Sequence, residues 1–377
     1  MSVHGLRNRA YKGAAGLVIG AALIAASGCG SDSDGGSGAS DGSADLSAAQ
    51  SIAEQASTRP TNLQLAKPVG KEIPTGKKIA FISCGVEACE IQGDIIKQGA
   101  ELLGWTAETI GTDGSPEQLQ NAFQTALRQG ADAVILNAVT RAVVAKQLEE
   151  AEKQGVPFVT LSSVEKTGDG ILANIADTRN SGRIGELLAA QILSDSEGDA
   201  NTLYVNISAF QILKALGDQF ESSYKKYCPD CEYGSIDIPA TSLGKDAPDR
   251  IVSYLRSHPQ VNHVVLSVSN ALGAGLPAAL RAAGLADKVK IIGQSADTQT
   301  FQDLQAGNIA AVVPYDYYTV DYLMLDALAR HWAGVPVNDA GPPYWLVKKD
   351  TAPDDTSAAF PVIEDYEAQW KKLWGKA

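Results

Sequence analysis

The stretch 77–105, KKIAFISCGVEACEIQGDIIKQGAELLGW, decides how the rest of the chain is interpreted. A short apolar run at 79–82 is followed by a polar loop, and apolar residues then recur at helical spacing from Ile91 to Leu103. Gly104 is the residue type that ends a helix. The pattern predicts the strand–loop–helix unit of an α/β domain. In open parallel sheets such loops bind ligands, so the loop 83–92 is the first candidate for function, although it could also serve only as a connection.

The same alternation of strand and helix continues along the chain. Ser115-Pro116-Glu117-Gln118 predicts a helix start, with a Ser cap, Pro at the first position and Gln three residues after the cap. Two comparable α/β runs follow one another, near 77–176 and 200–313, and their short loops predict parallel sheets. Neither run has a GxGxxG fingerprint or a phosphate-loop lysine, so no nucleotide cofactor is expected. An amphipathic helix is expected near 363–374.

Composition limits the classes of partner. The chain has 377 residues, of which 45% are hydrophobic, enough for a large core in one or two domains. The net charge of −13 and the pI of about 4.8 argue against nucleic acid, which requires basic surface.

The N-terminus has the pattern of an export signal. A basic start is followed by a small-to-apolar run at 13–26, which is too short for a permanent membrane span. Ala26-Ser27-Gly28-Cys29 resembles the cleavage site of a bacterial lipoprotein, with an ordinary secretory signal as the alternative. Residues 1–28 would be removed, Cys29 lipidated, and 29–76 would form a flexible tether followed by a surface strap. We therefore expect a protein anchored by lipid to the outer face of the cytoplasmic membrane.

The other cysteines occur in two local pairs. Cys84 and Cys89 flank the first loop, and Cys228 and Cys231 follow a predicted helix. In an exported protein these pairs favour two structural disulfides. Zinc would need four ligands, and the histidines have no ligand spacing to Cys228 and Cys231, so no metal is expected. A redox motif normally opens a helix after a strand, and this pair follows a helix instead.

An ordered set of segments resembles a known family. These are KKIAFISC…QGAELLGW, QTALRQGADAVILNAV, AEKQGVPFVTLSS, VVLSVSNALGAGLPAALRAAG and IIGQSADTQTFQDLQAGNIAAVV. Together they are similar to the type I periplasmic binding proteins, the ribose-binding-like receptors of ABC importers. The resemblance covers about 77–348. It implies an α/β fold of two Rossmann-like lobes with parallel sheets, joined by three crossover segments, with a ligand held between the lobes by hinge closure.

The resemblance also implies boundaries and partners. The crossings would fall near 176–178, 314–315 and 345–348. Lobe 1 would comprise 77–176 plus 315–345, and lobe 2 would comprise 178–314 plus 346–377. The protein would be a monomeric, non-enzymatic receptor without a cofactor that passes a small-molecule ligand to the permease subunits of an importer. A sensor for a membrane signalling partner is the alternative. A hydrolase using Ser162 or Ser163 is disfavoured because the chain has no GxSxG elbow.

The ligand residues follow from the resemblance, loop by loop. Asn137 keeps the Asn of the third loop, whereas the Asp-Arg pair of sugar-binding members is replaced by two serines and their second-lobe Arg by a leucine. The first loop lacks the aromatic residue of those members. The expected ligand-binding residues are Glu87, Gln92, Asn137, Ser162, Ser163, Phe210, Leu216, Ser269, Asn270, Ser295 and Tyr315.

This set predicts the chemistry of the ligand. Serines form weaker, neutral hydrogen bonds than carboxylate and guanidinium groups do. The sequence therefore favours a ligand less polar than a simple sugar, such as an aromatic or steroid-like compound. A sugar remains the alternative, and an anion would be possible if Arg141, Arg179 or Lys214 faced the ligand.

Overall fold

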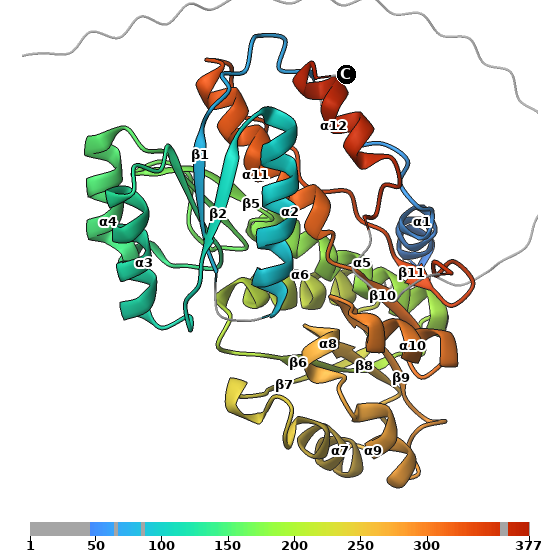
Figure 1. Ribbon diagram of the computed structural model, residues 1–377. Coiled ribbons are helices and arrows are strands. Elements are labelled where there is room, and N and C mark those ends of the chain that lie inside the picture. Colours follow the sequence, from blue (N-terminus) through green and yellow to red (C-terminus); the bar gives the residue numbers. More distant parts are fainter. Residues whose placement is uncertain (1–45, 64–66, 84–86, 355–360, 377) are drawn as a thin grey trace, which may run out of the picture. The chain divides into compact units, whose positions relative to one another are not determined.

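The protein forms two parallel sheets flanked by helices in a computed structural model (Figure 1). The structure describes residues 46–63, 67–83, 87–354 and 361–376. The strands are β1 (Lys78–Ile82), β2 (Thr106–Ile110), β3 (Ala133–Leu136), β4 (Phe158–Leu161), β5 (Ile171–Ile175), β6 (Asn201–Asn206), β7 (Glu232–Asp237), β8 (His263–Leu266), β9 (Lys290–Gln294), β10 (Ala311–Val313) and β11 (Val347–Lys348). The helices are α1 (Leu46–Ser57), α2 (Glu87–Leu103), α3 (Pro116–Arg128), α4 (Arg141–Gln154), α5 (Thr178–Ser196), α6 (Gln211–Tyr227), α7 (Ala247–Ser257), α8 (Ser269–Leu272), α9 (Leu276–Ala282), α10 (Thr298–Ala306), α11 (Tyr317–Trp332) and α12 (Tyr366–Trp374), with a 3₁₀ turn at Ala240–Ser242.

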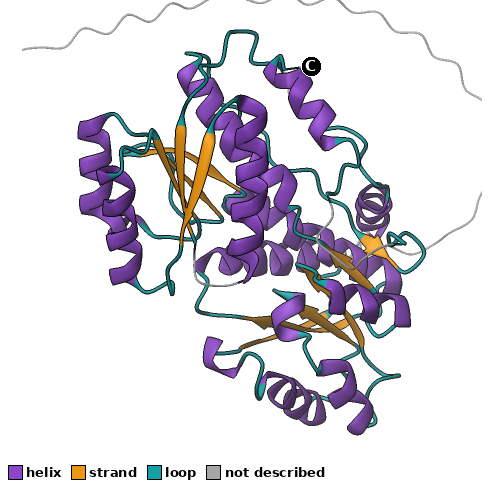
Figure 2. Cartoon of the chain, viewed as in Figure 1, coloured by secondary structure: helices purple, strands orange, loops and turns teal. Residues whose placement is uncertain are grey.

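The first sheet has the strand order β2-β1-β3-β4-β5, and all of its strands are parallel. Its central strands are continuous apolar runs, as strands covered on both faces must be, whereas β2 lies at an edge and is largely exposed. One apolar core joins this sheet to α2, α11 and α12, and another joins it to α3 and α4. Figure 2 shows these helices on both faces of the sheet.

The second sheet has the order β11-β10-β9-β8-β6-β7, in which only β11 is antiparallel to its neighbour. Helices α7 to α10 contribute to the core on one face, and α1, α5 and α6 contribute to the core on the other. The expected α/β architecture of two lobes with parallel sheets is confirmed.

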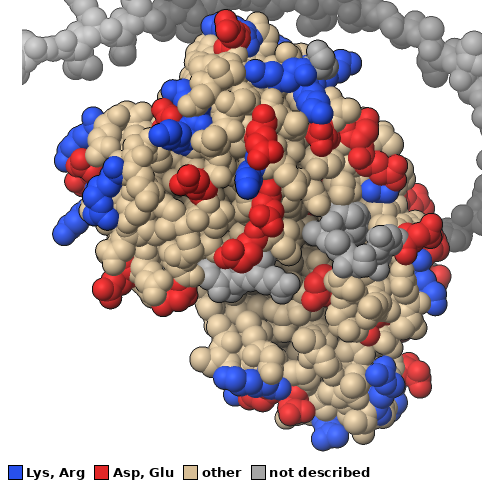
Figure 3. All heavy atoms as spheres, viewed as in Figure 1, with Lys and Arg blue, Asp and Glu red and all other residues tan. Residues whose placement is uncertain are grey.

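Helices α2 and α11 pack closely on the first sheet, and this contact positions the candidate site. A Cβ atom on Gly99 of α2 would lie 2.5 Å from Leu325 and 2.9 Å from Tyr322 of α11, so only glycine permits the approach. Glu90, Asp94 and Glu101 of α2 are exposed. Figure 3 shows a line of mainly acidic side chains, interrupted by a basic one, on this face of the molecule.

The two ends of the described chain pack together beside the first sheet. Val69 donates a backbone hydrogen bond to Leu373, and Leu63 donates one to the Gln369 side chain. Leu63, Val69 and Ile73 anchor the strap in the first core, while most of the other described strap residues are exposed, as expected of a surface segment. The helix α1 packs on α5 instead, with Ala49 and Ala53 buried.

The C-terminal tail is divided between the sheets, which corrects its assignment as a whole to lobe 2. β11 pairs with β10 in the second sheet, but α12 packs on the first core. Trp374 stacks on Tyr322 of α11, and Trp370 packs against the same ring at an angle. Trp374 Nε1 donates to Asp326 at 3.1 Å. Burial of two indoles, which the sequence shows only as an amphipathic pattern, determines where the helix lies.

The expected export signal, Cys29 and most of the tether lie outside the described residues. Across the part of the chain that the structure does describe, none of the helices combines the length and the apolar character that a membrane crossing needs.

Candidate functional site

Strained backbone marks the loops that follow the carboxyl ends of the strands. Ala138, Ser162 and Ala176 directly or closely follow β3, β4 and β5, and Ser295 directly follows β9; each has a positive φ, between 49° and 64°. A residue with a Cβ atom adopts this conformation at a cost of about 1–2 kcal/mol. Such strain persists where the surrounding structure imposes it and is concentrated at functional sites. The carboxyl edges of the two sheets are therefore the place to examine.

Three buried polar side chains form a chain of hydrogen bonds at the edge of the first sheet. Gln92 Nε2 donates to Asp321 Oδ1 at 2.7 Å, and Gln92 Oε1 accepts from Asn137 Nδ2 at 2.8 Å. Gln92 is 3% exposed, Asn137 6% and Asp321 0%. Burial raises the pKa of Asp321 well above 3.8, and the hydrogen bond from Gln92 opposes this shift. Asn137 Oδ1 and Asp321 Oδ2 are buried without a hydrogen-bond partner among the described residues.

Two tyrosines of the crossover between β10 and α11 connect loops of both sheets. The Tyr315 hydroxyl lies 2.8 Å from Ser162 Oγ after β4, and Tyr317 forms a side-chain hydrogen bond with Ser295 after β9. Their ring centroids are 5.1 Å apart. Burial raises the pKa of both phenols, and the serine hydrogen bonds oppose the shift. The crossover thus brings neutral hydroxyl groups from both sheets to one segment.

The edge of the second sheet has polar groups that lack such partners. Ser267 Oγ, Ser269 Oγ and Asn270 Oδ1, all after β8, are buried without a hydrogen-bond partner within the described ranges. Ser269 points at Gly293 of β9, where a Cβ atom would lie 2.3 Å from its Oγ. Phe210, at the start of α6, is 46% exposed.

Three of the expected ligand residues do not join these groups in the described structure. Leu216 is 1% exposed and lies in the core between α5 and α6, so its assignment to the ligand set is wrong. The carbonyl oxygen of Leu216 lies close to Gly185 of α5, since a Cβ atom added to Gly185 would be only 2.2 Å from this oxygen. Ser163 Oγ donates to the Val139 carbonyl at 2.8 Å, which is a structural role within the loop. Glu87 begins α2, and its side chain lies outside the described structure.

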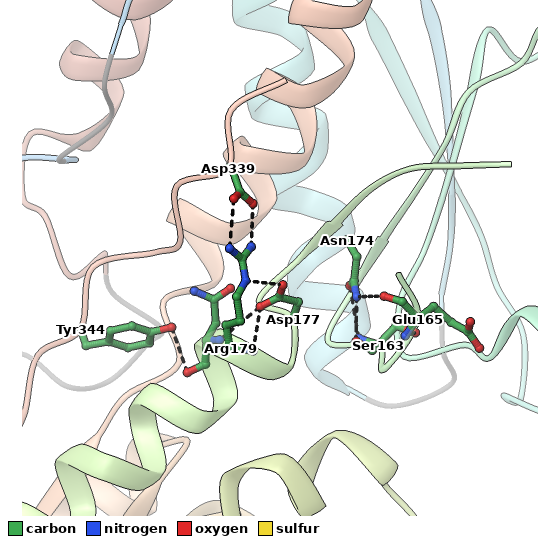
Figure 4. A network of polar contacts seen from close by, with 8 residues as sticks. Ser163, Glu165, Asn174, Asp177, Arg179, Asp339 and Tyr344 are labelled. Carbon is green, nitrogen blue, oxygen red and sulfur yellow. Dashed lines mark hydrogen bonds and ion pairs between the residues drawn. The ribbon is translucent and has the colours of Figure 1, made fainter. Parts of the chain in front are cut away.

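The basic side chains considered as ligands for an anion form ion pairs and hydrogen bonds within the protein instead. Arg179 bonds to Asp177 and, through both terminal nitrogens, to Asp339 (Figure 4). Arg141 bonds to carbonyl groups of the loop 166–169, and Lys214 pairs with Asp218 one turn along α6. These contacts give no support to an anionic ligand.

The second cysteine pair forms the expected disulfide. Cys228 and Cys231 are bonded, with Cα atoms 5.3 Å apart. The pairing of Cys84 with Cys89 stays a prediction because Cys84 lies outside the described residues.

Sequence reasoning missed Asp321. The available signal for Asp321 was an acidic residue inside the apolar helical run VDYLMLDALA. An acidic residue in a helix that is apolar all round is expected to be buried and to need a partner.

Comparison with known proteins agrees with this geometry. Residues 89–335 match the model of the periplasmic binding protein domain. A D-apiose import binding protein from Actinobacillus succinogenes is 24% identical over 230 residues, covering 58% of this chain and 70% of the relative.

Solved structures show the same fold. A glucose-galactose binding protein from Geobacillus stearothermophilus superposes with a TM-score of 0.65 and 20% identity, over 74% of this chain and 100% of that one. A 5-methylthioribose transporter solute binding protein from Thermotoga lettingae gives a TM-score of 0.66 and 21% identity, over 83% of this chain and 100% of that one.

Proposed function

Since the chain belongs to the family of periplasmic binding proteins, we propose that it captures a small hydroxylated compound, a sugar or a polyol, and delivers it to an ABC importer. The family consists of solute-binding receptors outside the cytoplasm. The observation that carries the choice of ligand is the buried chain of Asp321, Gln92 and Asn137 at the edge of the first sheet. A buried polar group is stable only when it is hydrogen-bonded. A ligand with several hydroxyl groups would supply the missing partners.

The proposed mechanism is closure of the two lobes around the ligand. A ligand that bonds to groups of both sheets binds the closed form more tightly than the open form. The difference between the two binding free energies determines how far the ligand shifts the population toward the closed form. The crossover tyrosines, Tyr315 and Tyr317, lie where such closure would act because each bonds to a loop of a different sheet. No chemical step is needed for this function.

The less polar ligand expected from the sequence is the second candidate. Phe210 and the two crossover tyrosines offer aromatic surface for an aromatic or steroid-like compound. The comparisons give this candidate no support, because the similar proteins are described as binding or importing sugars.

A thermal-shift screen of the purified chain tests the ligand class. The panel contains D-apiose, D-glucose, D-galactose and 5-methylthioribose, together with aromatic acids and steroids. Binding at one hundred times Kd stabilises the native state by about 2.7 kcal/mol, which is readily seen as a higher Tm. We expect at least one sugar to stabilise the protein. Stabilisation by steroids or aromatic acids alone would replace the proposal with the second candidate.

The proposed site of action is the outer face of the cytoplasmic membrane, with a lipid on Cys29. The sequence 26–29 supports this, as does the tether that follows. Cys29→Ala should move the protein from the membrane fraction to the soluble fraction of the envelope. Retention of Cys29→Ala in the membrane would contradict the anchor and leave the ligand proposal intact.

A further inference from the structure

We propose that Asp321 is a positioning residue that determines which hydrogen-bonding group the first sheet presents to the ligand. Asp321 orients the amide of Gln92, Gln92 orients the amide of Asn137, and Asn137 then presents its carbonyl oxygen. The ligand must therefore donate a hydrogen bond at this point, from a hydroxyl or an N–H group. The inference rests on the proposed function because it assumes that a ligand meets Asn137.

The direction of this chain follows from the chemistry of its members. Gln92 turns its Nε2, and not its Oε1, toward Asp321, so its NH₂ donates to Asp321 Oδ1 at 2.7 Å and the carboxyl oxygen accepts. The carbonyl of Gln92 then faces the opposite way, where it accepts from Asn137 Nδ2 at 2.8 Å. An amide has one donor end and one acceptor end, so the remaining group of Asn137 is Oδ1. That atom has no partner among the described residues.

Packing prevents one amide from turning over independently. The three side chains come from α2, the end of β3 and α11, and all are buried. Gly99 keeps α2 in close contact with α11. If Gln92 alone reversed, its NH₂ would face the NH₂ of Asn137 and its carbonyl would face the carboxylate. Both hydrogen bonds would be lost in a buried environment, so the amides can reverse only together.

Asp321 acts through Gln92 rather than by contact with the ligand. It lies one helical turn beyond Tyr317, the first residue of α11, and is 0% exposed. Asn137 instead lies at the strand end, directly before the strained residue Ala138. The end of the chain at the carboxyl edge of the sheet is thus the Asn137 carbonyl, and the orientation of this amide is determined two side chains away.

Asp321→Asn tests the chain because a carboxamide can donate as well as accept, so both amides can reverse. The matched control is Asp326→Asn, a buried acid of the same helix that bonds to Arg330 and Trp374 instead. Gln92→Ala breaks the chain without changing a buried acid. The first measurement records the side-chain NH₂ resonances of Gln92 and Asn137 by NMR in the ligand-free protein. We expect Asp321→Asn to shift both resonances and Asp326→Asn to shift neither.

The second measurement compares ligands by calorimetry. The probes are D-glucose and D-galactose, or the sugar that gives the largest shift in the thermal screen, with analogues in which one hydroxyl is replaced by fluorine. Fluorine accepts weakly and cannot donate. At one ring position the wild type should bind the fluorinated sugar at least about tenfold more weakly. Asp321→Asn and Gln92→Ala should reduce this ratio to about threefold or less, and Asp326→Asn should preserve it.

The outcomes separate the inference from the proposed function. An unchanged Asn137 resonance in Asp321→Asn overturns the chain of orientation. The resonances could shift while the ratio of affinities for the parent and the fluorinated sugar stays at its wild-type value in both Asp321→Asn and Gln92→Ala. That result overturns the role of Asp321 in ligand selectivity. If no sugar binds the wild type, the proposed function fails and with it the statement about the ligand, while the NMR result still decides whether Asp321 orients Asn137.

Discussion

The carboxyl edges of the two sheets are organised differently. At the first edge, Asp321, Gln92 and Asn137 hold one another in place before a ligand binds. At the second edge, Ser267 and Ser269 have hydroxyl groups without partners within the described ranges. The difference indicates a division of labour in binding. Under the proposed function, this predicts that the first edge selects the ligand and that the second gains its hydrogen bonds when the lobes close.

The two edges also differ in buried charge. Asp316 caps α11, and Asp321 and Asp326 lie within this helix, and all three are buried against the first core. The buried polar groups after β8 and β9, such as Ser267 and Gln294, are neutral. Burial raises the pKa of all three acids. The acids around α11 should therefore lower stability as the pH rises, whereas buried His263 of β8, whose pKa burial lowers from 6.5 to about 4, should lower stability as the pH falls.

The largest effect is expected for Asp316→Asn. Burial raises the pKa of Asp316 from 3.8 to about 6, and the hydrogen bonds from Thr319 only partly oppose the shift. A raised pKa of an acid stabilises the folded state fully below the unfolded pKa, and this contribution is lost as the pH rises through the folded pKa. Between pH 4 and pH 7 the free energy of unfolding should thus lose up to about 3 kcal/mol from this group. Asp316→Asn should remove that loss.

Urea unfolding of wild type and variant at pH 4.5, 5.5, 6.5 and 7.5 measures this difference. Asp297→Asn is the matched control, because Asp297 caps α10 through the same contacts with a threonine three residues on but is exposed. If Asp316→Asn and Asp297→Asn change the pH profile equally, burial around α11 is not the cause.

A second prediction compares one residue from each edge. Asn137→Ala leaves the carbonyl of Gln92 buried without its partner and removes the proposed ligand contact, so affinity should fall by about 2 kcal/mol, or roughly thirtyfold. Ser269→Ala removes a hydroxyl that has no partner in the described free protein. Its loss should weaken binding by about 0.5–1 kcal/mol and leave stability unchanged. Isothermal calorimetry with the best sugar measures both, and equal losses of affinity would end the distinction between a preorganised edge and a responsive one.

Most of the fold was predictable because local signals agree with it. Ser115 accepts from the Gln118 backbone, and Pro116 begins α3, as the sequence indicated. The capping box is incomplete, since the Gln118 side chain bonds to Asp113 instead of the cap. The location of α12 was not predictable. An amphipathic pattern shows that a helix has an apolar face, but which core receives that face depends on contacts with α11 that are distant in sequence.

The candidate site was predictable in part, from residues at or just after the strand ends and on the last crossover, although Gln92 lies within α2 and not in the expected loop. Gln92, Asn137, Ser162 and Tyr315 all take part in hydrogen bonds at the first edge or the crossover. Leu216 was misplaced because positions two residues apart on α6 face opposite ways, so Lys214 is exposed whereas Leu216 lies in the core. The positive φ of Ser162 and its neighbours in the fold has no sequence signal, because it is imposed by the sheet rather than by the residue type.

A similarly small effect is expected at the exposed aromatic residue of the second edge. Phe210 is 46% exposed, so it contributes little to the core, and closure on a ligand would bury its ring. Loss of that contact in Phe210→Ala should weaken binding by about 1 kcal/mol, or roughly fivefold. The free energy of unfolding should stay within about 0.5 kcal/mol of wild type. Phe210→Tyr keeps the ring and should keep the affinity. Calorimetry and urea unfolding measure the two quantities. A Phe210→Ala variant with wild-type affinity would show that the second edge closes on the ligand without this ring, and the responsive edge would then consist of the groups after β8 alone.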